Sequence, residues 1–345
     1  CFRIPAFTAQ TEQTAKTFEP LSRNLAMMRQ HLSEIDDSYR EISDTAAASK
    51  EQLSAVHTVL TELTENAKSE SEQLSAQKQA IDELVTASQQ HAQETNDVLD
   101  KVLSNILGDP IGQTFGKRAT IKVFSLKEAG YRGYMAKVKL HDPGAVKLVL
   151  SHDKVGDKGE TTSQAAKRTG AALAINGGGF AKSNGLIYPM GITVVDGEIK
   201  TFYRTDLSFI GLNKSGHLVG GKITSREQIK ALNVMQGATF VPTLLKDGKK
   251  QVIPARWKNK KEPRTLIGHF SNGDLLLIVV DGREFGYSTG VTLEEAQDKL
   301  LEFNVRDAYT LDGGGSSTFY YNGKVLNRPS DGRERLLATN FCIYP

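Results

Sequence analysis

The residues best suited to chemistry are concentrated in one stretch, Thr-Leu-Asp-Gly-Gly-Gly-Ser-Ser-Thr at positions 310–318. Consecutive glycines let a ligand approach the backbone closely and leave N–H groups that can bind oxyanions. The hydroxyls that follow can donate and accept hydrogen bonds, and Asp312 adds a carboxylate at the end of a predicted strand. We therefore interpret this stretch as a catalytic or anion-binding loop. The alternative is a hairpin turn in which Asp312 accepts backbone hydrogen bonds.

A second glycine cluster follows another predicted strand. Residues 176–180 read Asn-Gly-Gly-Gly-Phe and come directly after the apolar run 171–175. Asn176 by itself could be a turn residue. The repetition of the same design at a second strand end instead predicts that the two loops share one site.

A third strand end supplies a second carboxylate. The apolar run 275–280 ends at Asp281, and a helix at 292–303 follows, opened by a Thr-x-x-Glu capping box. The next strand, 308–311, ends at Asp312. Strand, helix and strand at this spacing predict a crossover between parallel strands, which finish at the same edge of a sheet. Asp281 and Asp312 should therefore face one cleft.

Basic residues flank this edge, and guanidinium groups match phosphate oxygens well. The five arginines concerned are Arg264, Arg283, Arg328, Arg333 and Arg335. Each alone could be a solvated surface charge, but their position beside glycine-rich strand ends favours phosphate binding for one or two of them.

The remaining elements of this part predict an α+β domain with a mixed sheet. They are β-rich runs at 120–124, 134–140 and 146–150, a short helix at 162–169 ending before Gly170, and paired strands at 209–212 and 217–219.

The first third of the chain has a different pattern. One heptad register holds from Leu21 to Val102, and no proline or glycine interrupts residues 21–107, which is typical of a coiled coil. Leucine is frequent at a, and β-branched residues such as Ile35 and Ile42 recur at d. This pairing favours three or four strands over two, and we expect a parallel homotrimer through residues 21–107.

The a and d positions, which form the seam between the helices, also include polar residues in the second half of the pattern: Glu70, Gln77, Ser88, His91 and Thr95. These residues either set the register of the helices or bind an ion on the axis, or they mark a locally frayed coil. An antiparallel fold-back within one chain is a further alternative, although no turn signal supports it. The predicted organisation is an N-terminal segment at 1–20, a stalk at 21–108 and a globular domain at 109–345.

Composition narrows the class of protein. Residues 1–108 carry nine basic and seventeen acidic residues, a net charge of −8, whereas the remainder carries +11, which favours an anionic ligand for the globular part. No apolar run is long enough for a membrane span. The two cysteines and seven histidines form no zinc pattern. Scattered lysines without stacking aromatics argue against nucleic acid, and the 314–318 sequence lacks the closing glycine of a serine-hydrolase elbow.

Six motifs in series resemble the phosphodiester glycosidase family. They are Asn-Gly-Gly-Gly-Phe at 176–180, Pro-Arg-Thr at 263–265, Val-Val-Asp-Gly-Arg at 279–283, Gly-Tyr-Ser-x-Gly-x-Thr-Leu-Glu-Glu at 286–295, Leu-Asp-Gly-Gly-Gly-Ser-Ser-Thr at 311–318 and Asn-Arg-Pro-Ser-Asp-Gly at 327–332. The resemblance covers about residues 115–345 and implies hydrolysis of a sugar-1-phosphodiester to a free sugar and a phosphomonoester.

For that reaction we assign Asp312 as base or nucleophile, Asp281 as its partner or as an anchor for Arg283, and Glu284 as a reserve carboxylate. The residues expected to bind substrate are Asn176, Gly177, Gly178, Arg264, Arg283, Gly313, Gly314, Gly315, Ser316, Ser317 and Arg328. No cofactor is required, but Ca²⁺ or Mg²⁺ between Asp281 and Asp312 is left open. The rival function is a non-catalytic receptor-binding module for a phosphorylated surface glycan.

A trimeric rod that carries a glycan-degrading head resembles a bacteriophage tail fibre or baseplate protein. This analogy implies a bacterial surface glycan such as teichoic acid as substrate and other tail or baseplate proteins as partners. The expected location is extracellular, on a virion tail, with the bacterial cell surface as the alternative. Because the chain begins at Cys1, we expect a fragment or a processed product.

Overall fold

A computed structural model describes residues 96–345 without a gap, and before them residues 27, 29, 35, 38, 40, 42, 45, 46, 48–58, 79, 81 and 83. The chain divides into two compact units, residues 1–100 and 101–345. This division lies eight residues before the domain boundary that the sequence predicts at 108/109. The second unit, which we call the head, contains every motif of the predicted site.

The described residues of the first unit are helical, among them 48–58 and 96–100. The predicted heptad seam lies largely outside the described residues, and its polar positions from Glu70 to Thr95 lie wholly outside them. The coiled coil and the trimer therefore stay predictions. None of the helices in the described part of the chain is long and apolar enough to cross a membrane.

Three sheets and one β-ribbon make up the head. The largest sheet has the order β1 (Gly112–Phe115), β2 (Ala119–Glu128), β3 (Tyr131–Leu140), β16 (Leu275–Val280), β15 (Arg264–Phe270), β17 (Val305–Leu311), β13 (Thr243–Lys246) and β14 (Lys249–Lys250). The second has β19 (Lys324–Val325), β18 (Phe319–Tyr321), β5 (Leu173–Asn176), β20 (Thr339–Ile343) and β4 (Val146–Leu150). The third has β11 (Leu218–Gly221), β10 (Ser208–Asn213), β12 (Val234–Phe240), β8 (Ile192–Val195) and β9 (Glu198–Phe202), and the ribbon pairs β6 (Phe180–Ser183) with β7 (Leu186–Pro189).

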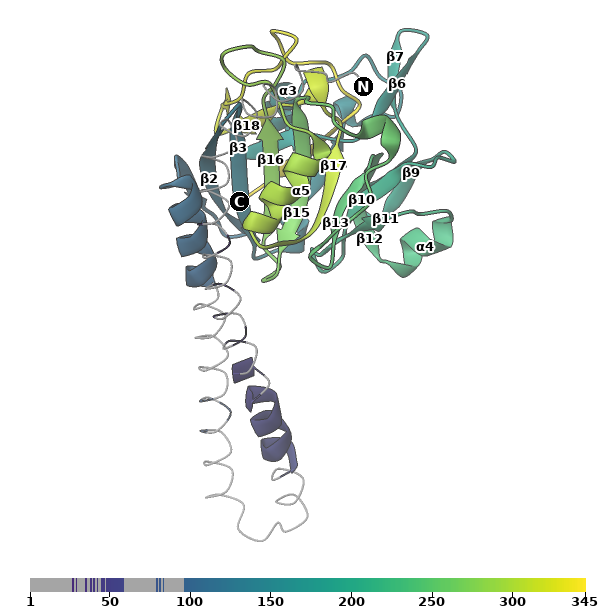
Figure 1. Cartoon of the computed structure of the whole chain (residues 1–345). Helices are drawn as coiled ribbons and strands as arrows, with labels where there is room; N and C mark the ends of the chain where they lie inside the picture. The colour runs from purple at the N-terminus through teal and green to yellow at the C-terminus, as the bar shows by residue number, and fades with distance from the viewer. Residues whose placement is uncertain are drawn as a thin grey trace, which may run out of the picture. The chain divides into compact units, whose positions relative to one another are not determined.

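Antiparallel pairing corrects the mixed sheet expected from the sequence. Strands β16 and β17 do run in the same direction, as the crossover predicts, but they are not neighbours. Strand β15 lies between them and pairs antiparallel with both, placing Arg264 opposite Val280 and Thr265 opposite Leu311. Asp281 and Asp312 therefore leave the sheet at the same edge, one on each side of β15 (Figure 1).

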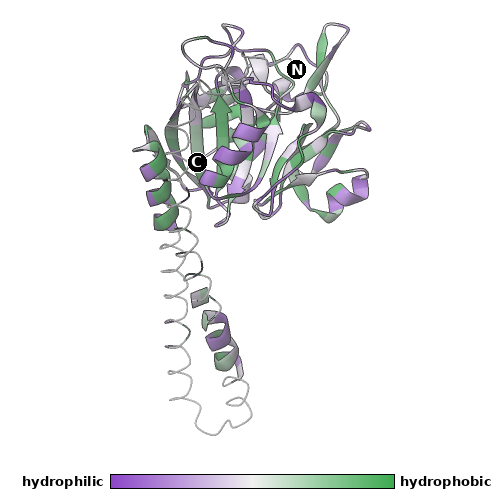
Figure 2. Cartoon of the chain, in the orientation of Figure 1, coloured by the Kyte–Doolittle hydropathy of each residue, from purple (hydrophilic) through white to green (hydrophobic). Residues whose placement is uncertain are grey.

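Helices cover the outer faces of two sheets, and a common core lies within. Helix α5 (Leu293–Glu302) packs on β17 and β13, and α3 (Thr162–Thr169) packs on β5, β18 and β20. One hydrophobic cluster joins residues from all three sheets, including Ile210, Ile267, Phe319 and Phe341. Figure 2 shows strand β16 coloured as hydrophobic, while α5 carries both colours because one face is buried. The strand ends that carry the glycine loops are thus held on a rigid core.

Local sequence signals account for several elements. Strand β4, strand β16 and helix α3 have the predicted bounds, and α3 ends at Gly170, whose φ of 76° is left-handed. Thr161 and Thr292 cap α3 and α5 with the side-chain pattern of a capping box. Helix α4 (Arg226–Ala231) was not predicted.

Candidate active site

The loop after β17 folds into a compact turn around Asp312. Residues Gly314–Ser316 form a 3₁₀ turn, and Gly314 has a φ of 60°, which glycine adopts without strain. The N–H of Gly314 donates to the carbonyl of Pro263 at 2.9 Å, and the N–H of Ser317 donates to the carbonyl of Gly314 at 3.1 Å. The Gly314 amide therefore attaches the turn to Pro263, the residue before β15, and the Ser317 amide closes the turn itself. The expectation that all three glycine amides face a ligand is wrong for Gly314.

Asp312 is partly exposed and has a serine as its side-chain donor. The hydroxyl of Ser316 donates to Oδ2 of Asp312 at 2.6 Å, and Nη1 of Arg335 donates to the same hydroxyl at 3.3 Å. Arg335 is fixed in turn by Asp331, to which Nη2 donates at 2.6 Å. Carboxylate, hydroxyl and guanidinium thus form one connected chain.

Ser316 and Ser317 have no exposed surface to offer a ligand, since 0% and 1% of them are accessible. The direct phosphate contacts predicted for these serines are therefore not supported. Ser316 orients Asp312 instead. Gly315 is required by close packing, because a Cβ at this position would lie 2.1 Å from Oδ2 of Asp331.

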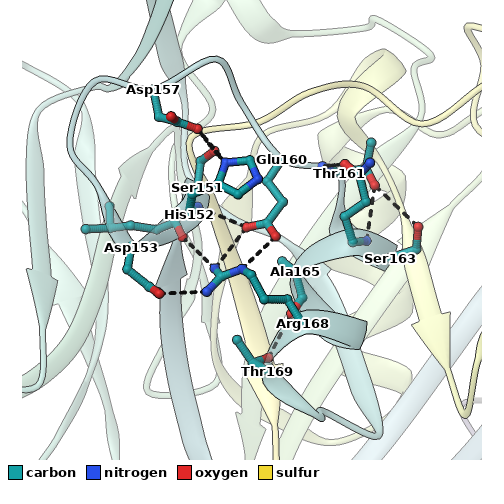
Figure 3. Close-up of polar contacts among 12 residues, drawn as sticks. Ser151, His152, Asp153, Asp157, Glu160, Thr161, Ser163, Ala165, Arg168 and Thr169 are labelled. Atoms are coloured by element: carbon teal, nitrogen blue, oxygen red, sulfur yellow. Dashed lines mark hydrogen bonds and ion pairs between the residues drawn. The ribbon is translucent and has the colours of Figure 1, made fainter.

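A second polar network holds the segment that carries Arg335. Glu160 is buried and receives two hydrogen bonds from Arg168, at 2.8 and 2.9 Å (Figure 3). The backbone of Glu160 pairs with that of Leu337, and both the N–H and the hydroxyl of Ser163 bond to the carboxylate of Glu334. Arg335 lies between these two attachment points, so its position beside Ser316 is built into the fold.

Asp281 lies at the same sheet edge but is almost wholly buried, with 1% of its surface accessible. Its Oδ1 accepts from Nδ2 of Asn327 at 3.0 Å and from the N–H of Arg328 at 2.9 Å, and its Oδ2 accepts from the hydroxyl of Tyr287 at 3.2 Å. Asn327 also donates to the carbonyl of Ser317 at 3.0 Å. Asp281 therefore ties the 327–328 segment and Tyr287 to the end of β16.

Burial raises the pKa of both carboxyls, because a low-dielectric environment disfavours the charged form. For Asp312 the Ser316 hydroxyl and the positive charge of Arg335 oppose that rise. For Asp281 the three hydrogen-bond donors oppose it. The two groups thus share the direction of the shift, but Asp312 alone is partly accessible to a substrate.

The terminal nitrogens of Arg283 remain available beside the glycine turn. Its Nε donates to Glu262 at 2.6 Å, while its Nη2 lies 3.1 Å from the position that a Cβ on Gly314 would occupy. Nη1 and Nη2 have no hydrogen-bond partner among the described residues. The guanidinium therefore lies against the glycine turn with two nitrogens free to bind an oxyanion.

Arg328 and Glu284 form a pair above Tyr287. Nη1 of Arg328 donates to Glu284 at 3.1 Å, and the guanidinium carbon lies 3.9 Å from the centroid of the Tyr287 ring. Burial beside Asp281 raises the pKa of Tyr287 to about 12, so its hydroxyl stays a donor. Glu284 is engaged by this arginine, and its role as a reserve carboxylate stays a prediction.

Asn176 ties the first glycine loop to the loop after β17 and to β15, and does not face a ligand. The side chain is completely buried: Nδ2 donates to the carbonyl of Asp312 at 2.6 Å, and Oδ1 accepts from Thr265 at 2.7 Å and from the N–H of Thr318 at 3.1 Å. A Cβ on Gly177 or Gly178 would lie 2.3 or 2.7 Å from residues of β20 and β12. The predicted sugar contacts of Asn176, Gly177 and Gly178 therefore give way to a framework role.

Arg264 also serves the framework. Its Nε donates to the carbonyl of Val291 at 3.2 Å and its Nη2 to the carbonyl of Lys260 at 2.6 Å. Thr265, the next residue of β15, bonds to Asn176, so the two side chains point to opposite faces of the sheet. Only Nη1 of Arg264 lacks a partner among the described residues, and the predicted phosphate contact depends on that atom.

The predicted divalent cation does not fit these residues. Both oxygens of Asp281 accept hydrogen bonds from protein donors, which compete for the lone pairs that a hard cation needs. The described residues contain no group of three or more His, Cys, Asp or Glu that could hold a metal ion. We therefore derive no step through a metal.

Several residues of the site were missed or left without a role by sequence reasoning. Tyr287, Asn327 and Asp331 lie inside the motifs of the family resemblance, and Arg335 is one of the five flanking arginines. Their position in or beside these motifs places them near the same end of the sheet, but only the fold shows that they contact Asp281 and Ser316. The motifs therefore could have marked these residues as part of the site, but not which residue contacts which.

Known proteins are similar in sequence to this chain. An SPβ prophage-derived uncharacterised protein, YomE, of Bacillus subtilis (strain 168) is 29% identical over 278 residues, covering 73% of this chain and 41% of that protein. The N-acetylglucosamine-1-phosphodiester α-N-acetylglucosaminidase of Bos taurus is 29% identical over 208 residues, covering 53% of this chain and 39% of the enzyme. The chain thus spans about two fifths of the length of the curated relatives it matches.

Solved structures share the fold. The catalytic domain of the zebrafish N-acetylglucosamine-1-phosphodiester α-N-acetylglucosaminidase, auto-inhibited by its pro-peptide, superposes with a TM-score of 0.54 at 23% identity, covering 69% of this chain and 86% of that domain. A hypothetical protein from Synechocystis gives a TM-score of 0.50 at 14% identity, covering 68% of this chain and 64% of that one.

The family follows from the part of the chain that carries the site. Residues 169–344, just over half of the chain, match the family described as phosphodiester glycosidase. This range contains both glycine loops, Asp281, and the segment from Asn327 to Arg335. The chain therefore belongs to the phosphodiester glycosidase family of hydrolases.

Proposed function

We propose that the head hydrolyses a sugar-1-phosphodiester linkage in a phosphate-containing surface glycan, with teichoic acid as the polymer that best suits a protein with a predicted stalk and a prophage-derived relative. The carrying observation is the arrangement of Asp312. Its partly exposed carboxylate is bonded to Ser316, which Arg335 also contacts, and the free nitrogens of Arg283 lie against the same turn. A carboxylate beside guanidinium groups suits cleavage of a sugar from a phosphate.

In the proposed reaction the bond between the anomeric carbon and the phosphate oxygen breaks. Water or Asp312 supplies the electron pair to the anomeric carbon, and the phosphomonoester leaves with the electrons of the broken bond. When water attacks, Asp312 takes its proton. When Asp312 attacks, water subsequently releases the sugar from the carboxylate. Both routes require Asp312 to be ionised at the start.

Arg283 would stabilise the charge that develops on the leaving phosphate, since its two terminal nitrogens can bind oxygen atoms bidentately. A phosphate monoester is already a good leaving group, so strong acid assistance is unnecessary. Asp281 has no such part in this scheme. It is a positioning residue that fixes Tyr287 and the 327–328 segment beside the loop.

The second candidate is a non-catalytic module that binds the same class of glycan. The arginines would serve that function equally well, but an accessible carboxylate repels phosphate and would weaken simple binding. Asp312 therefore favours hydrolysis over retention. Display on a phage tail fibre or baseplate, as a homotrimer, is the accompanying proposal. It is supported by the heptad pattern of residues 21–107 and by the prophage origin of YomE, and it implies an extracellular location.

A substrate panel tests the function. Purified protein would be incubated with several sugar-1-phosphodiesters and teichoic acids, and the products identified by mass spectrometry. The proposal predicts a free sugar and a phosphomonoester from at least one substrate, and loss of both products with Asp312→Asn. Binding without any product from the whole panel would contradict hydrolysis and favour the binding module.

A further inference from the structure

A cavity outside the candidate active site has the composition of a site for an anionic sugar. Its volume is about 880 Å³, and it is lined by Ile192, by residues 202–206 and by residues 222–224. These segments leave β9 and β11 at the same end of the third sheet, as the pairing of Phe209 with Gly221 and of Ile192 with Phe202 requires. The cavity size is that of typical small-molecule sites.

Positive charge dominates the cavity. Arg204 and Lys222 line it and form no ion pair or hydrogen bond within the described part of the chain, whereas Asp206 is the acidic residue of the lining. Two further cations lie at its border: Arg226 stacks 5.0 Å above the ring of Phe202, and Arg256 lies 3.5 Å from Asp206. The lining therefore has two cations and one carboxylate, and two further arginines at its border add to an attractive field for an anion.

Aromatic and hydroxyl groups complete the lining. Tyr203 lines the cavity with 55% of its surface exposed, and its backbone N–H donates to the carbonyl of Gly191 at 3.0 Å. Thr205 and Thr224 add hydroxyls. A flat aromatic face with nearby cations and hydroxyls suits a sugar ring that carries phosphate.

A series of neighbouring residues leads from Gly179, in the first glycine loop, to the lining of this cavity. A Cβ on Gly179 would lie 3.1 Å from the ring of Phe240, and that ring lies 6.4 Å from the ring of Trp257. Arg256 stacks 5.5 Å from Trp257 and reaches Asp206 in the cavity lining. On a second route, the carbonyl of Thr239 accepts from the N–H of Gly179, and a Cβ on Gly191 would lie 2.8 Å from the Thr239 side chain and 3.0 Å from that of Thr205.

We propose that the cavity lined by residues 202–206 and 222–224 is a subsite for a neighbouring phosphate-bearing sugar unit of the polymer whose linkage is cut at Asp312. The inference rests on the proposed function, because it assumes that the substrate is a polymer with repeated phosphates. It goes beyond that function by explaining how a polymer is distinguished from a single phosphodiester. Charge attraction and ring contact at the subsite would hold the chain while one linkage is cut.

Kinetics with the double variant Arg204→Glu/Lys222→Glu tests the subsite. Two charge reversals facing an anion should raise KM for a polymeric teichoic acid by about tenfold or more. They should leave kcat/KM for the shortest cleavable sugar-1-phosphodiester within about twofold, because neither residue belongs to the catalytic loop. The matched control is Lys214→Glu/Lys324→Glu, which makes the same charge change at exposed lysines outside the cavity and should leave both substrates unaffected.

A binding measurement separates failure of the subsite from failure of the proposed function. Affinity for a teichoic acid of the poly(glycosyl 1-phosphate) type, whose repeating sugars are joined by phosphodiesters, would be measured by calorimetry at low salt, on the full chain and on both double variants. The subsite predicts about tenfold weaker binding for Arg204→Glu/Lys222→Glu alone. Equal affinities, or equal KM values on the polymer, would overturn the subsite even if the wild-type protein cleaves. A wild-type protein that cleaves nothing would overturn the function, and the binding result would then decide the subsite.

Discussion

Asp281 and Asp312 follow two strands that run in the same direction and end at the same edge of one sheet, but they differ in exposure and in their hydrogen-bond donors. Asp281 is 1% exposed and accepts from Asn327, Tyr287 and the backbone of Arg328. Asp312 is partly exposed and accepts from the hydroxyl of Ser316. One carboxylate is built into the framework, and the other is presented to a ligand.

This difference shows that a strand-end aspartate acquires its role from the donors around it. A carboxylate surrounded by three donors has little capacity left for a proton or a sugar, but it can hold three segments together. A carboxylate with a serine donor, close to arginines, keeps an oxygen for chemistry. Substitutions at these two aspartates and at their hydrogen-bond donors test whether Asp281 acts in stability and Asp312 in activity, and they measure the size of each effect.

The largest expected effect is on activity, for Asp312→Asn. Replacing the carboxylate by an amide removes the proposed base or nucleophile, and groups of this kind contribute about 10²–10⁴-fold to rate. We expect a loss of kcat in that range with little change in thermal unfolding temperature. The measurement is product release under saturating substrate, with circular dichroism to check the fold. A folded variant with full activity would remove Asp312 from the mechanism.

Asp281→Ala should instead reduce stability. It leaves the amide of Asn327, the N–H of Arg328 and the hydroxyl of Tyr287 without their acceptor, and unsatisfied buried donors cost about 1–3 kcal/mol each in the worst case. We expect a loss of about 3 kcal/mol in the free energy of unfolding, measured by urea titration. The control is Asp298→Ala at an exposed ion pair. A loss no larger than that of the control would contradict the framework role.

Asn176→Ala makes the same test on the first glycine loop. The change removes the donor to the carbonyl of Asp312 and the acceptor for Thr265 and Thr318. We expect a loss of about 2 kcal/mol in unfolding free energy, with lower kcat because Asp312 is less well fixed. A stable variant with an increased KM alone would restore the sugar contact expected from sequence.

Ser316→Ala should move the acid limb of the pH profile. Asp312 must be ionised to act, burial raises its pKa, and the Ser316 hydroxyl lowers it. Without that hydroxyl the pKa rises further, so activity on the acid side should fall at a higher pH than in the wild-type protein. The measurement is kcat/KM across the acid and neutral range. An unchanged acid limb would show that another group controls it.

The smallest expected effect is that of EDTA. Because the oxygens of Asp281 are engaged by protein donors, no divalent ion is needed between the two aspartates, and chelation should leave kcat unchanged. Activity assayed after dialysis against EDTA, with and without added Ca²⁺ or Mg²⁺, checks this. Loss on chelation with recovery on Ca²⁺ would show that the donor arrangement around Asp281 rearranges to bind metal.

The fold was predictable where the signal is local. The apolar run of β16, the capping box of α5 and the glycine after α3 fix these elements by short-range rules. Strand β15 was missed as the partner of both β16 and β17, because its polar ends and Gly268 weaken the strand pattern and its pairing is long-range. The sequence predicted that β16 and β17 are parallel neighbours, whereas in the fold they run in the same direction with β15 between them.

The site was predictable in location but not in the role of each residue. Glycine clusters marked both loops. In the first loop the side chain of Asn176 is completely buried, whereas in the second loop the carboxylate of Asp312 is partly exposed. Residue type alone cannot show burial or which donors reach a carboxylate. Arg335 illustrates the limit, since its contact with Ser316 depends on the attachment of Glu334 and Leu337 to a distant segment.

The most direct test of the central claim uses a sugar-1-phosphodiester that the protein cleaves. The reaction is run in ¹⁸O-labelled water, and both products are analysed by mass spectrometry. Attack at the anomeric carbon, assisted by Asp312, predicts the label in the released sugar and none in the phosphomonoester. Label in the phosphate would mean cleavage of the bond to phosphorus, and it would contradict the proposed roles of Asp312 and of the arginines beside it.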